Sequence, residues 1–212
     1  MNSLKTIISL LANVALIVLV ADSVIHYLHK GGQGNMEGAG SVCFRYFTND
    51  SNILCALCCA PLIFFGVKGL ASGSYDIPKW ALLLKFTGTV AVAVTMMTVL
   101  VFLGPTQGYG KMFAGKNLYL HLVCPLLAIV SLCLTEGSAP VSFSESLLGL
   151  LPTLVYGLVY AILVLVKKVW PDFYGFNRGG LWYVSCAALP VGTLALCLAL
   201  MALHNAVMCP GV

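Results

Sequence analysis

Long apolar stretches follow one another along the whole chain and are separated by short polar segments. About 20 apolar residues in a helix cross the hydrocarbon core of a bilayer, which is about 30 Å thick. Backbone polar groups inside a bilayer must bond within their own segment, so each spanning stretch is expected to be a helix. The pattern predicts an all-α integral membrane bundle of six transmembrane helices, one polytopic domain over residues 1–212, with helices at about 6–28, 44–67, 80–103, 118–134, 146–166 and 181–204. The fourth is the shortest.

The composition supports the same interpretation. Hydrophobic residues make up 60% of the 212 residues and charged residues only 8%, whereas soluble domains contain about 25% charged residues. The net charge of +4 is small, and no basic run is longer than Lys167-Lys168. This charge suits anionic lipid head groups better than nucleic acid. We therefore expect membrane lipids or a lipid-like molecule, and no nucleic acid, as partners.

An even number of spans places both termini on one side of the membrane. The first, third and fifth loops, at about residues 29–43, 104–117 and 167–180, then lie on the other side. The side with these three loops (the loop side) has more basic residues than the side with the termini (the terminal side). The positive-inside rule therefore predicts that the three loops are cytoplasmic. In a bacterium this membrane would be the cell membrane. The basic residues on the loop side are Lys30, Arg45, Lys111, Lys116, Lys167, Lys168 and Arg178, against Lys5, Lys68, Lys79 and Lys85.

Nine cysteines raise the question of disulfides or a metal site. Seven of them fall inside apolar stretches, where free cysteine behaves as a small hydrophobic residue. The cluster Cys55, Cys58 and Cys59 has no histidine nearby that would complete a zinc site. The chain also lacks a P-loop, a Gly-x-Ser-x-Gly elbow and a His-Glu-x-x-His motif. We expect reduced thiols, no metal and no cofactor.

Polar residues are distributed unevenly along the depth of the predicted bundle. Most lie within about two helical turns of the loop side, and polar groups inside a membrane are costly enough to suggest function. On the terminal side, Lys85 and His204 are near helix ends, where each is expected to extend to water. The residues near the loop side are Asp22, His26, Arg45, Thr48, Asn49, Asp50, Ser51, Asn52, Asn117 and His121, with Asp172, Tyr174, Asn177 and Arg178 in the fifth loop.

Thr48 and His121 are the candidate catalytic residues. Each lies about one turn inside an even-numbered span, which places both roughly 6–8 Å below the same surface. A hydroxyl and an imidazole at one depth could form the nucleophile and general base of ester hydrolysis. The structural alternative is that Thr48 bonds to a carbonyl of its own helix and His121 links two helices.

Four further residues are predicted to support this pair. Ser51, Asn52 and Asn117 could orient the imidazole or donate to an oxyanion, and Arg45 shares the helix face of Thr48.

Proline at position 125 is expected to disturb the helix beside His121. Pro125 cannot donate to the His121 carbonyl, so that carbonyl should be free, the helix should bend, and a polar cavity should open there.

These residues also resemble a known family. The patterns Phe47-Thr48-x-x-Ser51-Asn52 and His121-x-x-x-Pro125 are similar to those of the androgen-induced-protein family of multi-pass membrane proteins, and the Thr-x-x-Ser-Asn form is that of its bacterial branch. The resemblance spans roughly residues 44–204 and includes the aromatic and proline segment 170–176, which lacks the full Tyr-Pro-x-Pro-Phe form. It implies a threonine hydrolase that cleaves esters between fatty acids and hydroxy fatty acids, with Thr48 and His121 as catalytic residues.

Two other functions remain open. A small membrane transporter would place polar residues at the midplane, often at broken helices, and Pro61, Pro152 and Pro190 could break helices here. The midplane stretches 90–98 and 191–200 contain only threonine and cysteine as weakly polar residues. A non-catalytic sensor or assembly protein is the third possibility. We interpret the sequence as that of a membrane-embedded lipid ester hydrolase.

Overall fold

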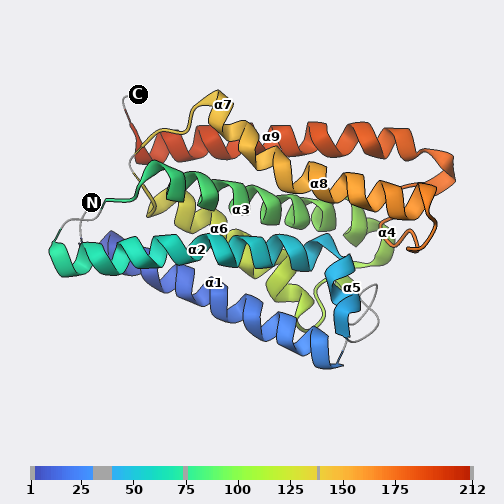
Figure 1. Ribbon diagram of the computed structural model, residues 1–212, viewed down its shortest axis with the longest axis horizontal. Helices are drawn as coiled ribbons and strands as arrows, with labels where there is room; N and C mark the ends of the chain where they lie inside the picture. Colours follow the sequence, from blue (N-terminus) through green and yellow to red (C-terminus); the bar gives the residue numbers. More distant parts are fainter. Residues whose placement is uncertain (1–2, 31–39, 74–75, 138, 211–212) are drawn as a thin grey trace.

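The computed structural model describes residues 3–30, 40–73, 76–137 and 139–210. Within these ranges the chain forms helices and turns and contains no strand. The long helices run side by side along one axis, and α1 (Ser3–Lys30) begins at the end of the bundle where α9 (Trp182–Met208) ends (Figure 1). The prediction of an all-α fold compatible with a membrane bundle is confirmed.

The helices match the apolar stretches of the sequence. Five are long and apolar enough to span a membrane, namely Ser3–His29, Phe47–Ser72, Lys79–Gln107, Phe143–Val166 and Trp182–Met208. A further apolar helix, Tyr119–Leu134, is shorter and corresponds to the fourth stretch, which the sequence also identifies as the shortest. The described residues therefore fit an integral membrane protein with five to six apolar helices.

Three of the spans consist of consecutive helical pieces. The third joins α3 (Lys79–Thr98), the π-helical turn η2 (Val99–Leu103) and α4 (Gly104–Gln107). The fourth joins the π-helical turn η3 (Tyr119–Val123) to α6 (Cys124–Leu134). The fifth joins α7 (Phe143–Ser146), η4 (Leu147–Gly149), α8 (Leu150–Ala161) and η5 (Ile162–Val166). The second is α2 (Phe47–Ser72), and the connections contain η1 (Gly40–Arg45), α5 (Tyr109–Met112) and η6 (Arg178–Gly180).

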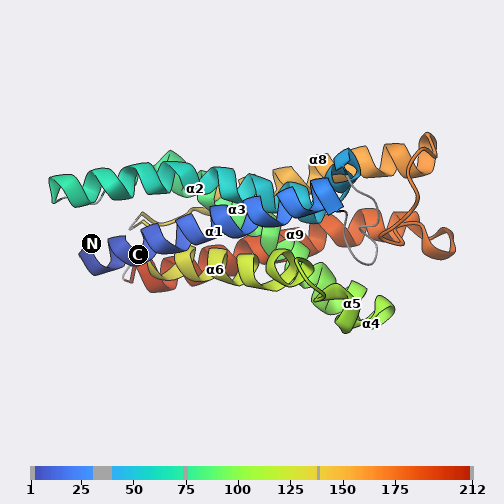
Figure 2. The same cartoon turned by 90° about the horizontal axis from the view of Figure 1, so that it is seen from below.

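Helix α3 occupies the centre of the bundle (Figures 1 and 2). It contacts α2, α6, α8 and α9, while α1 contacts α2 and α6. Helices α2 and α3 pack closely at Gly88, where an added Cβ atom would lie 2.9 Å from the Cys55 Cα. A glycine is therefore required for this spacing. Much of α3 is covered by other helices, so polar side chains on its covered faces are held inside the protein.

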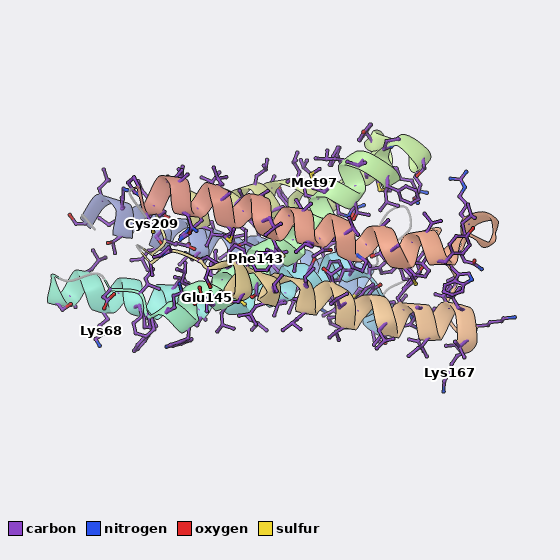
Figure 3. The ribbon with its side chains drawn as sticks, turned by 90° about the horizontal axis from the view of Figure 1, so that it is seen from above. Lys68, Met97, Phe143, Glu145, Lys167 and Cys209 are labelled. Carbon is purple, nitrogen blue, oxygen red and sulfur yellow. The ribbon has the colours of Figure 1, made fainter. Side chains whose placement is uncertain are left out.

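Lysine side chains lie at both ends of the bundle, and one lysine is buried in its interior. Lys68 and Lys167 point away from the protein at opposite ends (Figure 3), as expected for side chains that reach water beside a membrane. Lys85 on α3 is completely buried, with its Nζ 2.7 Å from the Asn13 Oδ1 and 3.7 Å from a carboxylate oxygen of Glu136. The expectation that Lys85 extends to water is wrong, because α3 is central and leaves this side chain no path to the surface.

His204 is also completely buried rather than extended to water. Its Nδ1 lies 3.0 Å from the Leu132 carbonyl oxygen and its Nε2 lies 3.3 Å from the Ala139 carbonyl oxygen. The next residue, Asn205, bonds both the amide and the carbonyl of Val141 at 2.8 Å. These contacts attach the last turns of α9 to α6 and to the segment before α7, so the imidazole links elements where the sequence predicts a surface position.

All nine cysteines are free thiols, and every one except Cys186 is buried. Most of them line helix contacts, such as Cys55, Cys59 and Cys124 in the apolar core around α1, α2 and α6. Within the described ranges, no three residues among His, Cys, Asp and Glu are arranged to hold a metal ion.

Candidate functional site

Thr48 lies at the start of α2, at the end of the bundle where α1 ends and α9 begins (Figure 1). Tyr46, the residue before α2, has an extended backbone with φ −103° and ψ 124°. It separates η1 from the helix. His121 lies in the π-helical turn η3, which contacts α2. Thr48 is 6% exposed and His121 is 5% exposed. The two residues thus meet at one depth in a nearly closed part of the protein.

The Thr48 Oγ1 is 3.4 Å from the His121 Nε2. The other ring nitrogen, Nδ1, is 2.6 Å from the carbonyl oxygen of Met112 in α5. A carbonyl only accepts hydrogen bonds, so Nδ1 carries a proton and the Nε2 of a neutral ring presents its lone pair to the threonine. The geometry therefore matches a hydroxyl facing an oriented base, at a distance that is long for a formed bond and usual for an unliganded site.

Met112 could not be identified from the sequence as the group that orients His121. Its contribution is a backbone carbonyl, which every residue has, so no side-chain pattern marks it. Its position depends on the short helix α5, which begins after Gly108 at a φ of +96° that favours glycine.

The helix around His121 differs from the expected one. The Cys124 amide bonds the Tyr119 carbonyl, five residues earlier, so the turn is π-helical rather than α-helical. In this register, the carbonyl that Pro125 leaves without an amide belongs to Leu120. This carbonyl lies one residue before the one that the sequence singles out, and the prediction about the His121 carbonyl itself stays a prediction.

The side chain of Asn52 donates a hydrogen bond to this π-helical turn. Its Nδ2 donates to the Leu120 carbonyl at 3.1 Å and to the Thr48 carbonyl at 2.7 Å, so one amide connects α2 with the π-helical turn. Its Oδ1 is buried and has no hydrogen-bond partner among the described residues. Asn52 thereby fixes the spacing between the two helices that carry Thr48 and His121.

The other three predicted supporting residues also bond to protein groups. Ser51 shares a hydrogen bond of 2.8 Å with the Thr95 hydroxyl. Asn117 accepts a hydrogen bond of 2.7 Å from the Tyr27 hydroxyl. The guanidinium of Arg45 lies 5.9 Å from the centre of the Trp170 ring. These contacts connect α2 to α3, α1 to the start of the fourth span, and η1 to the fifth loop.

Tyr174 from the fifth loop is a further residue of the site. Its hydroxyl accepts a hydrogen bond of 2.9 Å from the Phe47 amide and also interacts with the backbone and side chain of Thr48. The first amides of a helix have no partner within the helix, so an oxygen acceptor is favourable at this position. The sequence predicts that Tyr174 and Thr48 lie near the same end of the bundle, but their contact depends on how the fifth loop folds back.

A groove lies next to the pair. A groove of about 510 Å³ opens between α2 and α8, and Phe47 and Ser51 on either side of Thr48 line it. Thr48 and His121 themselves do not line this groove, and most of its surface is apolar.

The contacts of Asn52 predict a measurable loss of stability. Replacing Asn52 with Ala leaves the Leu120 carbonyl buried without a donor, which typically costs about 1–3 kcal/mol. Thermal unfolding in detergent should show a lower midpoint for Asn52→Ala than for the wild type. Asn177→Ala is the control, because Asn177 is exposed, and equal midpoints for the two variants would contradict this role of Asn52.

Comparison of the chain with protein-family models, with curated proteins and with solved structures finds no match. Functional inference for this protein therefore depends on the geometry of the site and on the short motifs around Thr48 and His121.

Proposed function

We propose that this protein is a membrane-embedded lipid ester hydrolase in which Thr48 is the nucleophile and His121 the general base. The observation that carries the proposal is the approach of the Thr48 Oγ1 to the His121 Nε2 at 3.4 Å, with the Nδ1 held by the Met112 carbonyl. A threonine with a purely structural role needs only a hydrogen bond from its hydroxyl to a carbonyl of its own helix. The additional alignment with an oriented imidazole is what nucleophilic catalysis requires.

The proposed reaction has two steps. In the first, the His121 Nε2 takes the hydroxyl proton of Thr48 while the Oγ1 attacks the ester carbonyl, and the imidazolium then protonates the departing alcohol. In the second, the Nε2 takes a proton from water, the hydroxide attacks the acyl-threonine, and the fatty acid leaves as the proton returns to Thr48. The Met112 carbonyl keeps the ring in place throughout and stabilises its positive form.

The start of α2 is the proposed binding position for the oxyanion. The Phe47 amide and the Tyr174 hydroxyl lie there beside Thr48, at the positive end of the helix dipole. In the structure the Phe47 amide donates to the Tyr174 hydroxyl, so both groups would turn toward the oxyanion when substrate binds and then stabilise the tetrahedral intermediate. Their position supports attack by Thr48 rather than by another hydroxyl of the bundle.

The proposed substrate is an ester with long acyl chains. The pair lies among apolar helices, and the adjacent groove is lined mainly by apolar side chains. The resemblance of the Thr48 and His121 motifs to the androgen-induced-protein family supports esters between fatty acids and hydroxy fatty acids. The basic residues near this end support a cytoplasmic position for it.

One observation favours the alternative of a transporter. The buried group of Lys85, Glu136 and Asn13 adds a polar centre toward the other end of the bundle, as a transport path would need. However, α2 and α9 continue as single helices through Pro61 and Pro190, whereas transport sites are typically formed at broken helices. The hydrolase is therefore the function that we prefer.

Covalent labelling tests the proposal. Purified protein in detergent should react with a long-chain fluorophosphonate, and Thr48→Ala should lose the label. Thr193→Ala is the matched control, because Thr193 is a buried threonine in α9 whose hydroxyl bonds the Leu189 carbonyl. Labelling of Thr48→Ala at the wild-type level would contradict a nucleophilic role for Thr48.

A further inference from the structure

The groove between α2 and α8 is lined mainly by apolar side chains, with one carboxylate among them. It opens at the end of the bundle that holds Thr48 and has a volume of about 510 Å³, within the range of about 300–1,000 Å³ typical of pockets for small molecules. Nine of its eleven lining residues are aromatic or aliphatic, and the lining contains one charged residue, Asp50. The lining residues are Phe44, Phe47, Asp50, Ser51, Leu54, Leu151, Pro152, Val155, Tyr156, Val159 and Trp170.

Asp50 has no partner for its charge. Within the described parts of the chain, its carboxylate takes part in no hydrogen bond and no ion pair. Asp22, Glu136 and Glu145, by contrast, each pair with a lysine. Leaving a carboxylate among apolar side chains without a counter-charge is costly. The position of Asp50 therefore indicates a site whose missing component is a cation.

The aromatic side chains of the groove indicate which kind of cation it would bind. Phe44, Phe47, Tyr156 and Trp170 all line the groove, and aromatic ring faces attract ammonium and guanidinium groups. Trp170 already receives a cation in this way, since the Arg45 guanidinium lies over its ring at 5.9 Å. An acidic residue among aromatic rings is the chemistry that recognises an organic ammonium ion.

The rest of the groove suits an alkyl chain. Leu54 and Leu151 continue the lining away from Asp50, and Leu151 and Val155 are among the exposed side chains of α8. Because α8 is part of the apolar span Phe143–Val166, which is long enough to cross a membrane, these exposed side chains would face lipid. A chain could therefore enter the groove sideways from the bilayer without passing through water.

We propose that the α2/α8 groove binds a single-chain amphiphile with an ammonium head group. The ammonium ion lies against Asp50 and the surrounding rings, and the alkyl chain lies along Leu54, Leu151 and Val155. This binding does not depend on hydrolysis. The groove is nevertheless next to the proposed catalytic pair, because Ser51 lines it and donates to the Thr48 carbonyl at 3.3 Å.

Quenching of Trp170 fluorescence tests this binding. The probe is dodecyltrimethylammonium with a bromine on its alkyl chain, added to the purified protein in an uncharged maltoside detergent. The wild type should show saturable quenching that Trp170→Phe removes. Asp50→Asn should weaken binding by about tenfold or more, because it removes the charge that pairs with the ammonium ion while the aromatic rings remain. Asp76→Asn, which removes an exposed carboxylate near the other end of α2, should bind like the wild type.

Two further comparisons make the result decisive. Val155→Phe fills the groove while keeping Asp50 and adds no tryptophan, so it should also abolish saturable quenching, whereas Val130→Phe on the exposed face of α6 should not. Brominated dodecyl sulfate and a brominated alkyl maltoside carry the same chain without the ammonium group and should not saturate. Equal binding by Asp50→Asn and Asp76→Asn, or saturable binding of the sulfate probe, would overturn the proposal.

Discussion

Replacing either Thr48 or His121 with Ala is expected to lower the hydrolysis of long-chain lipid esters by about 10³-fold or more, because the nucleophile or its base is then missing. The two residues act on the same proton, so the double variant should be little worse than either single one. Thr48→Ser should keep part of the activity, since the hydroxyl remains but loses the methyl group that restricts its rotamer. Activity should rise with pH as the His121 imidazolium becomes neutral, because only the neutral ring accepts the proton.

Initial rates of purified variants in lipid nanodiscs measure these effects. The control is Thr193→Ala, which removes a hydroxyl that bonds only the Leu189 carbonyl of its own helix and should keep the wild-type rate. Unfolding midpoints of all variants show whether a lost rate reflects lost structure. A double variant that is slower than each single variant by the product of both effects would mean that Thr48 and His121 act independently.

Lys85→Met is expected to be among the most destabilising substitutions in the protein. It leaves Glu136, which is completely buried, without its counter-charge and removes the donor to Asn13. Removing one partner of a buried ion pair typically costs about 3–5 kcal/mol. Unfolding of the purified protein in detergent, by heat or by added dodecyl sulfate, measures the loss.

A second substitution should reverse much of this loss. In Lys85→Met combined with Glu136→Gln, no buried charge remains unpaired, and the glutamine oxygen can still accept from the Asn13 Nδ2, which bonds the Glu136 carboxylate at 2.6 Å. Lys68→Met is the control, since Lys68 points away from the bundle on α2 (Figure 3) and should change stability little. Equal stability of Lys85→Met and Lys68→Met would contradict the importance of the buried pair.

The positions of the helices could be predicted from the sequence because they depend on apolar length. The stretch 181–204 corresponds to α9 at Trp182–Met208, and the stretch 6–28 corresponds to α1 at Ser3–Lys30. The short fourth span was also expected. Apolar runs of this length have one stable form in a bilayer, so no knowledge of tertiary contacts is needed to find them.

The interior polar contacts could not be predicted in the same way. Equal depth allows Thr48 and His121 to meet, but their contact depends on the packing of α2 against η3, and the roles of the Met112 carbonyl and of Tyr174 depend on how two loops fold over the bundle. The burial of Lys85 cannot be predicted from its depth, which is compatible with contact to water, because only the central position of α3 excludes that contact. The π-helical register around His121 likewise depends on tertiary contacts, including the one made by Asn52.

The central claim is that Thr48 forms a covalent bond with the acyl group of its substrate. Acid quenching of the purified protein during its reaction with a long-chain 4-nitrophenyl ester, followed by mass spectrometry of the fragments, tests this claim most directly. We predict a fragment containing Thr48 whose mass is increased by one acyl group, and no acylated fragment from Thr48→Ala. An acyl group on a different side chain, with hydrolysis by Thr48→Ala at the wild-type rate, would contradict the claim.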